Sequence, residues 1–259
     1  MKKCFGFALS VLLTLAIAIS PWLHAETAQA AEELVVSAAA SLTNAFGELS
    51  KKFEAVNPDV KVALNFGASG ALLQQIEQGA PVDVFASADQ KTMNQANEKK
   101  LIIPETRKDF VRNGLVLIVP KDAKAPVKDI KGLAAAEVAK VSLGNPETVP
   151  AGRYAKEALT NEGIWDALAP KLILAENVRQ VLDYVSRGEV DAGFVFSSDV
   201  VIAKDKVQVV AKAEQHQPIL YPIATIAATK KKELAERFIA FVLSPEGQGA
   251  LQEFGFEKP

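Results

Sequence analysis

Small hydroxyl residues stand where hydrophobic runs of this sequence give way to helical patterns. Ser41 follows the apolar run 35–40, and apolar residues then recur at helical spacing as far as Phe53. Ser69 has the same kind of position, within the glycine-bearing stretch 65–71. The first turn of a helix has backbone N–H groups without partners and carries the positive end of the helix dipole. Small side chains let a ligand approach these groups, so each junction could bind an anion.

The arrangement recurs at two further junctions. Residues 144–152 form a loop with prolines and glycines ahead of a helical pattern, and Asn177 opens another helical pattern. Each junction has a plainer explanation: Ser41 and Asn177 as helix caps, and residues 65–71 and 144–152 as ordinary loops. Ligands of open α/β sheets collect at the carboxyl ends of strands. The four junctions together therefore predict one site that binds a small anion through hydrogen bonds and dipoles.

The scarcity of cysteine and histidine limits the alternatives. Cys4 is the only cysteine, and His216 is the only histidine outside the first 30 residues. A cysteine-based zinc site is therefore excluded, and Ser-His-Asp chemistry would have to use His216, which stands in a polar turn. The Gly-x-Ser-x-Gly motif of many serine hydrolases is absent from the sequence. We expect a binding protein and not an enzyme.

The first 30 residues have the pattern of a signal peptide. Lys2 and Lys3 precede the uncharged, mostly apolar run 5–19, and Ala28-Gln29-Ala30 fits a cleavage site, with Ala25 as a second possibility. An uncleaved membrane anchor is the alternative, since the apolar run nearly reaches spanning length. Cys4 precedes the apolar run, which is the wrong place for a lipid-modified cysteine. We expect export to the periplasm after cleavage.

The remaining chain of about 229 residues is slightly acidic, with 27 Lys and Arg against 30 Asp and Glu. No basic face is evident, which argues against nucleic acid and acidic membranes as partners. With no cysteine left, the chain must fold on packing alone, and a chain of this length can form one large core or two lobes. We expect a monomer.

Short runs of Val, Ile and Leu alternate with helical patterns, which predicts an α/β fold. Strands are predicted at residues 34–37, 60–64, 82–86, 114–119, 140–143, 171–174, 192–196, 207–210 and 219–228. Helices are predicted at residues 42–56, 71–78, 91–99, 152–162, 178–187 and 231–243, with a short one from about residue 244. The runs 114–120 and 219–228 are read as crossings between two lobes. The predicted limits are 31–115 and 222–259 for the first lobe and 116–221 for the second, and such lobes can hinge around a ligand.

Several motifs resemble those of one protein family. The segments 38–45, 75–90 and 149–159 closely resemble motifs of periplasmic molybdate-binding proteins of ABC transporters, and 243–248 and 254–256 add to the match. The resemblance covers essentially the whole chain after the signal peptide. It implies a two-lobed type II periplasmic binding protein fold, each lobe a mostly parallel sheet flanked by helices. It also implies capture of molybdate or tungstate, no separate cofactor, and delivery of the ligand to a membrane permease.

The resemblance also assigns the ligand contacts. It implies that the hydroxyl and backbone N–H groups of Ser41 and Ser69, and the backbone N–H groups of Ala151 and Val178, bind the oxyanion, so that molybdenum or tungsten enters only within it. The family's last contact is a tyrosine hydroxyl, where this chain has Phe196. A missing donor to a charged ligand would weaken binding by about 1.5–3 kcal/mol. Ser197 could supply a substitute hydroxyl, or Phe196 could simply pack the cleft floor.

The sequence is compatible with three other functions. The same fold could bind another small anion, such as sulfate or thiosulfate. An extracytoplasmic hydrolase or transferase could use Ser41 or Ser69 as its nucleophile, although no base for either serine is evident in the sequence. A ligand-sensing domain of a regulator would need a signalling module, which the chain does not contain.

Overall fold

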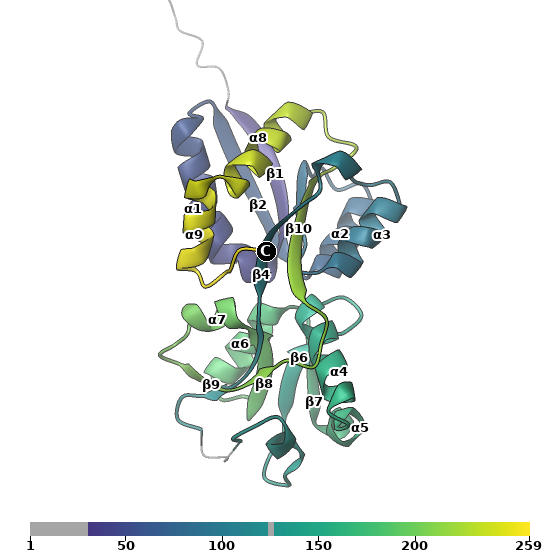
Figure 1. The fold of residues 1–259 in the computed structure, drawn as a ribbon, viewed down its shortest axis with the longest axis vertical. Coiled ribbons are helices and arrows are strands. Elements are labelled where there is room, and N and C mark those ends of the chain that lie inside the picture. The colour runs from purple at the N-terminus through teal and green to yellow at the C-terminus, as the bar shows by residue number, and fades with distance from the viewer. Residues whose placement is uncertain (1–30, 124–126) are drawn as a thin grey trace, which may run out of the picture. The chain divides into compact units, whose positions relative to one another are not determined.

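The computed structural model describes residues 31–123 and 127–259, so the predicted signal peptide lies outside the described residues. The described chain forms two five-stranded sheets with helices on both faces of each (Figure 1). We call these sheets with their helices the first and second lobes. The two-lobed α/β fold predicted from the sequence is thereby confirmed.

The first lobe has the strand order β2-β1-β3-β10-β4. In Figure 1, α1, α8 and α9 lie on one side of this sheet and α2 and α3 on the other. The strands are β1 (Glu32–Ala39), β2 (Val60–Gly67), β3 (Val84–Ala86), β4 (Lys108–Asn113) and β10 (Ile219–Thr225). The helices are α1 (Thr43–Val56), α2 (Ser69–Glu77), α3 (Gln90–Glu98), α8 (Lys232–Leu243) and α9 (Pro245–Glu253).

The second lobe repeats this arrangement, with the order β7-β6-β8-β5-β9. In Figure 1, α6 and α7 lie on one side of this sheet and α4 and α5 on the other. The strands are β5 (Leu115–Pro120), β6 (Val141–Gly144), β7 (Leu172–Ala175), β8 (Ala192–Phe196) and β9 (Val207–Ala213). The helices are α4 (Pro150–Asn161), α5 (Trp165–Leu168), α6 (Val178–Ser186) and α7 (Ser197–Val201).

Each sheet is mixed in the same way. In the first lobe, β1 pairs in parallel with β2 and β3, whereas β10 is antiparallel to both β3 and β4. In the second lobe, β6 pairs in parallel with β7 and β8, and β5 is antiparallel to β8 and β9. The parallel strands thus end at one edge of each sheet, where the helices α1, α2, α4 and α6 begin.

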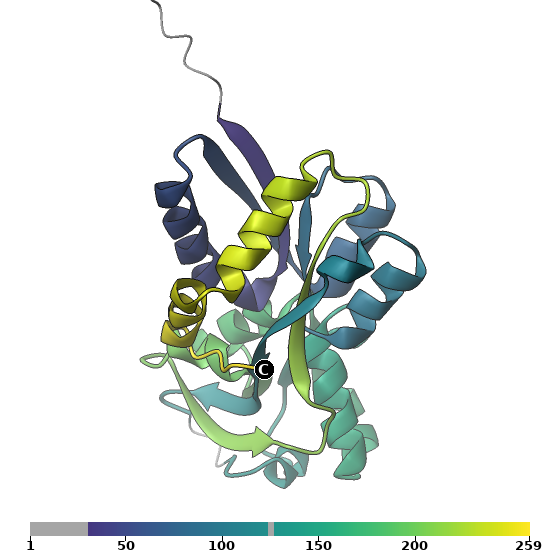
Figure 2. The same cartoon turned by 45° about the horizontal axis from the view of Figure 1, so that its top comes forward.

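The chain passes between the lobes twice, beside the adjacent strands β4 and β10 (Figures 1 and 2). Strand β5 belongs wholly to the second sheet and β10 wholly to the first. The first change of sheet therefore falls at Gly114, the first residue of the predicted crossing 114–120. The second falls between Ala213 and Ile219, before the predicted crossing 219–228. The lobe limits at residues 115 and 221 remain a proposal, close to these positions.

Strand β4 and the helices α5 and α7 were not predicted from the sequence. Of the six residues of β4, the edge strand of its sheet, only Phe110 and Val111 are buried, while Lys108, Asp109 and Arg112 are exposed. The helices α5 and α7 have only four and five residues, too few for a helical period to be recognised.

Aromatic residues dominate the core between the first sheet and its helices α1, α8 and α9. Phe46 and Phe53 of α1 contact Phe238 of α8 edge to face, with ring centroids 6.1 and 5.2 Å apart. Phe110 of β4 continues this cluster towards Tyr221 of β10. Together with the contact between Phe46 and Phe110, they join α1 to α8 and to the strands β4 and β10. Within the described residues, no helix is both long and apolar enough to span a bilayer.

Candidate functional site

A small buried cavity lies where the helix starts of the two lobes meet. Its volume is about 10 Å³, room for roughly one water molecule. All five residues that the resemblance places around the oxyanion line it, and their exposed fractions run from 0% to 4%. The lining residues are Ala39, Ala40, Ser41, Gly67, Ala68, Ser69, Ala88, Val149, Pro150, Ala151, Val178 and Phe196.

Three helix starts bring backbone N–H groups to this cavity. Ser69 is the first residue of α2, Ala151 the second of α4, and Val178 the first of α6. Within residues 31–123 and 127–259, none of these three N–H groups has a hydrogen-bond acceptor. Unpaired N–H groups are expected in a first helical turn, but burial makes them costly unless a ligand or water binds there. They therefore mark the cavity as a site for a hydrogen-bond acceptor.

Ser41 does not cap a helix, contrary to the plainer reading of its junction. It lies in a short 3₁₀ turn, Ala40–Leu42, and no described residue caps this turn or α1 with its side chain. Its Oγ lies 2.9 Å from the hydroxyl of Tyr221 on β10. The two residues are 180 positions apart in the sequence, so no local pattern could reveal that they pair. Asn177, by contrast, is a cap, since its side chain accepts the N–H of Gln180.

The hydroxyl of Ser69 is also positioned by the fold. Its Oγ accepts the backbone N–H of Ala88 at 3.0 Å, which leaves the hydroxyl proton available to a ligand. The next residue, Gly70, donates its N–H to the carbonyl of Thr148 in the second lobe at 2.9 Å. A Cβ at Gly70 would lie 2.7 Å from that carbonyl oxygen. The glycine of this turn therefore serves close contact between the lobes.

Phe196 and Ser197 face different hollows of the structure. Phe196 ends β8 and lines the cavity, and its ring packs against Tyr221 with centroids 5.7 Å apart. Ser197 is absent from the cavity lining. It faces a separate groove beside Gly114, where its hydroxyl would lie 2.8 Å from a Cβ at that glycine. The structure thus brings Phe196, but not Ser197, to the predicted site.

Two arginines near the helix starts connect the lobes. Arg153 in the first turn of α4 places two guanidinium nitrogens 2.6 and 2.8 Å from the Asp89 carboxylate, and it donates to the Thr92 hydroxyl at 2.8 Å. Asp89 also caps α3 by accepting the Thr92 N–H. The Arg153 and Asp89 side chains are 14% and 4% exposed, so this ion pair is largely shielded from water.

The second arginine, Arg179 in the first turn of α6, reaches Ser41 itself. It donates to the Ser41 carbonyl at 2.9 Å and to the side chain of Asn44 at 2.8 Å. Its Nε lies 2.7 Å from the carboxylate of Asp199, which also accepts the N–H of Phe196. Complete burial raises the pKa of Asp199 above its ordinary value, against the opposing effect of Arg179. Neither arginine was singled out from the sequence, although both stand one or two positions after a predicted N–H donor.

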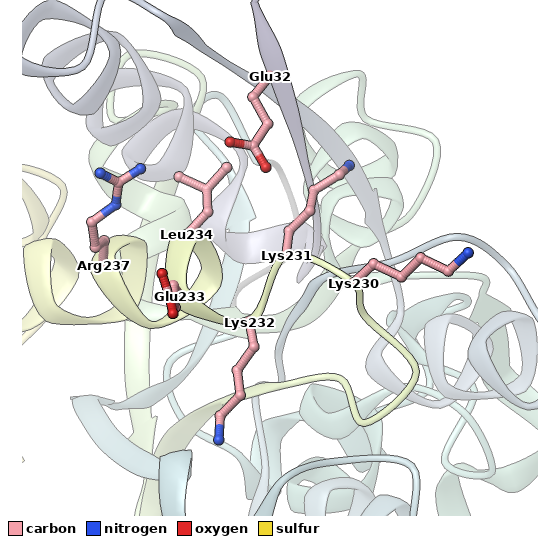
Figure 3. Close-up of a pocket in the computed structure, with 7 residues that line it drawn as sticks. All are labelled: Glu32, Lys230, Lys231, Lys232, Glu233, Leu234 and Arg237. Atoms are coloured by element: carbon pink, nitrogen blue, oxygen red, sulfur yellow. The ribbon is translucent and has the colours of Figure 1, made fainter.

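A second hollow, at the start of α8, has a basic lining but a different character. It is lined by Glu32, Lys230, Lys231, Lys232, Glu233, Leu234 and Arg237. Figure 3 shows that the three lysine side chains point in different directions instead of converging. Lys231 turns back to donate to the carbonyl of Glu33. This arrangement matches a solvated surface run, and it offers no common point for an anion. Among the described residues, no cluster of His, Cys, Asp or Glu could hold a metal ion.

Comparison with known proteins identifies the family. Residues 34–257 match the family model described as bacterial extracellular solute-binding protein. The chain belongs to this family. It is 40% identical over 225 residues to the putative ABC transporter substrate-binding lipoprotein YvgL of Bacillus subtilis, a match that covers 86% of this chain and 85% of that one.

Two further relatives carry names that concern molybdenum. The molybdate-binding protein ModA of Escherichia coli is 38% identical over 229 residues, which cover 86% of this chain and 88% of the relative. A solved structure of the substrate-binding domain of a putative molybdenum ABC transporter from Clostridium difficile is 44% identical. It superposes with a TM-score of 0.68 over 88% of this chain and all of that one. The resemblance inferred from the motifs is thereby confirmed.

Proposed function

We propose that this solute-binding protein captures molybdate between its two lobes and passes it to the permease of an ABC importer. The observation that supports this most is the set of buried N–H groups without partners, at Ser69, Ala151 and Val178, around one cavity. The hydroxyls of Ser41 and Ser69 complete a lining of neutral donors. The names of the E. coli and Clostridium relatives point to the same ligand.

Neutral donors in a buried site can hold a charged ligand firmly. A hydrogen bond to a charged group contributes about 1.5–3 kcal/mol net. Five such bonds would support micromolar or tighter binding after the entropy lost on association. Helix dipoles and backbone N–H groups would stabilise the negative charge of the anion from several sides, so no ion pair is needed.

Entry of the ligand requires movement. A tetrahedral oxyanion has five heavy atoms, whereas the cavity has room for roughly one water molecule. The lobes would separate about the two chain crossings to admit the anion and then close on it. In this mechanism Ser41 and Ser69 bind from the first lobe, and Ala151 and Val178 bind from the second.

Calorimetric titration of the mature chain with molybdate tests this function. We expect a dissociation constant in the micromolar range or below, and substitution of either Ser41 or Ser69 by Ala should weaken it about tenfold or more. Ser50→Ala is a matched control, because in the described part of the chain the one partner of the Ser50 hydroxyl is the carbonyl of Gly47 within α1. Absence of heat with tens of micromolar protein would overturn the proposal.

The same titration can distinguish which oxyanion is the preferred ligand. We propose that tungstate also binds, since it is a tetrahedral oxyanion of the same kind. Sulfate and thiosulfate are the alternatives within the fold. Competition of each anion against bound molybdate would rank them, and a clear preference for sulfate would reassign the ligand while leaving the binding mode intact.

A serine-dependent hydrolase gains no support from the site. Ser41 Oγ faces a tyrosine hydroxyl and Ser69 Oγ accepts a backbone N–H. In the described chain, neither hydroxyl has a histidine or carboxylate partner that could act as a general base. We therefore propose that the protein acts by binding and release, without turnover.

The setting of this function follows from the sequence. We propose that residues 1–30 direct export and are removed, at Ala30 or Ala25, and that the mature protein works in the periplasm as a monomer. The membrane permease and the oxyanion would be its only partners. Mass spectrometry of the secreted protein would give the cleavage site, and a mass that retains residues 1–30 would contradict it.

A further inference from the structure

The hydroxyl of Tyr221 is buried beside the proposed site, and the proposed function gives it no role. Tyr221 lies on β10 with an exposed fraction of 0%. Its ring packs edge to face on Phe110, Phe196 and Phe256. Among the described residues, its hydroxyl has two neighbours at hydrogen-bond distance: Ser41 Oγ at 2.9 Å and Asn113 Nδ2 at 3.2 Å.

The orientation of the Asn113 amide is fixed by two backbone donors. Asn113 Oδ1 accepts the N–H of Gly114 at 2.9 Å and the N–H of Ser198 at 3.3 Å. Because a backbone N–H can only donate, this side of the amide must be the oxygen. The Asn113 NH₂ group therefore faces the other way, where it donates to the Ser198 hydroxyl at 2.8 Å and to the Tyr221 hydroxyl.

This orientation sets the direction of the next hydrogen bond. The Tyr221 oxygen accepts from Asn113, which cannot accept in return, so the tyrosine proton needs another acceptor. Within the described residues, Ser41 Oγ is the only acceptor at hydrogen-bond distance. Burial raises the pKa of Tyr221 well above its ordinary value, with a further contribution from the charge of Asp199, so the hydroxyl keeps its proton. Tyr221 therefore donates to Ser41.

Because the Ser41 oxygen accepts the proton of Tyr221, the proton of the Ser41 hydroxyl itself can be donated to another group. Ser41 lines the cavity, so that proton is available to an anion there. Hydrogen bonds in such a chain polarise one another, which makes the last donor stronger than an isolated serine. The chain runs from the Asn113 amide to the Tyr221 hydroxyl, to the Ser41 hydroxyl and on to the ligand.

We propose that Tyr221 is a positioning residue for anion binding, which holds the Ser41 hydroxyl as a donor towards the oxyanion. The inference rests on the proposed function, since it needs an anion in the cavity. It assigns a role in binding to a residue that does not line the cavity. Asn113 supports it from the point where the chain first leaves the first lobe.

Tyr221→Phe tests the proposal, because it removes the hydroxyl and keeps the ring that packs in the core. Titration with molybdate should show binding weakened about tenfold. Tyr184→Phe is the matched control, since Tyr184 lies on α6 and is not among the residues that line the cavity. This control should bind as the wild type does. Thermal unfolding without ligand checks that the variants remain folded.

A double substitution separates positioning through Ser41 from a general structural effect. If Tyr221 acts through Ser41, adding Tyr221→Phe to Ser41→Ala should change the molybdate affinity less than twofold, because the proton that Tyr221 directs is already gone. A structural role would weaken binding by the same factor in both backgrounds and would overturn the inference. So would a Tyr221→Phe variant with wild-type affinity. Failure of the wild type itself to bind molybdate would instead refute the proposed function.

Discussion

At the scale of single residues, the site depends on where hydroxyl groups and their protons lie. Ser69 Oγ accepts a backbone N–H and Ser41 Oγ faces a tyrosine, so both serines have a proton to offer to the cavity. At Phe196, the ring occupies the place where the family resemblance implies a further hydroxyl. The chain thus keeps the apolar wall of the site and loses one donor.

Phe196→Tyr should therefore strengthen binding of molybdate. A restored donor to a charged ligand is worth about 1.5–3 kcal/mol, or roughly one to two decades in the dissociation constant. Titration calorimetry would measure the gain. Phe241→Tyr, on the half-buried side of α8, is the control and should leave the affinity unchanged. Equal or weaker binding by Phe196→Tyr would show that the ring edge does not face the anion.

At the scale of elements, the site depends on how closely helix starts approach one another. The start of α2 touches the loop before α4 through Gly70 and Thr148. The start of α4 in turn packs on the end of β6, where a Cβ at Gly152 would lie 1.8 Å from the carbonyl oxygen of Gly144. Glycines at these points let backbone pass against backbone, which no larger residue allows.

Gly70→Ala should hold the lobes apart at this contact. The added Cβ would lie 2.7 and 2.9 Å from backbone atoms of Thr148, which cannot rotate away as a side chain could. We expect molybdate affinity to fall about tenfold or more, with little change in unfolding temperature. Gly47→Ala is the control, because no atom of the described residues lies within 4 Å of a Cβ at that position. In a helix interior, alanine is more favourable than glycine by about 1 kcal/mol. Unchanged affinity of Gly70→Ala would show that this contact is not needed for binding.

The sequence revealed the parts of the site that depend on local pattern. Strand ends, helix starts and small residues between them are visible as changes in apolar spacing. Ser41, Ser69, Ala151 and Val178 lie at such junctions, whereas Phe196 was assigned from the family resemblance alone. The role of Tyr221 was not predicted, because its partner Ser41 is 180 positions away in the sequence. Arg153 and Asp89 are 64 positions apart, and charge alone does not tell which of many pairs will form. Strand β4 was missed because an edge strand can be polar on most positions.

At the scale of the whole molecule, the two lobes are joined by more than the chain crossings. Arg153 of the second lobe binds Asp89 and Thr92 of the first lobe. Arg179 of the second lobe binds Ser41 and Asn44 of the first lobe. Both arginines belong to the second lobe and both bind groups at helix starts of the first. These contacts favour lobes that lie close together, as the narrow cavity requires.

Arg153→Ala should let the two lobes move further apart. It leaves Asp89, which is 4% exposed, without its cation, so we expect the free energy of unfolding to fall by roughly 1–3 kcal/mol. Solution scattering of the unliganded variant should show a larger radius of gyration than the wild type. Arg112→Ala is the control, since its pair with Glu257 is exposed and should contribute less than about 1 kcal/mol. An unchanged radius would mean that the Arg153 pair does not hold the lobes together.

The neutral lining of the cavity has a consequence for how binding responds to acidity. Among the described residues that line it, none has a group that gains or loses a proton in ordinary solution conditions. The affinity should therefore follow the proton content of the oxyanion and not that of the protein. An anion that carries a proton would also bring an O–H group into a lining without a carboxylate to accept it. A solute-binding protein built in this way would stay selective for fully ionised ligands while the pH outside the cell varies.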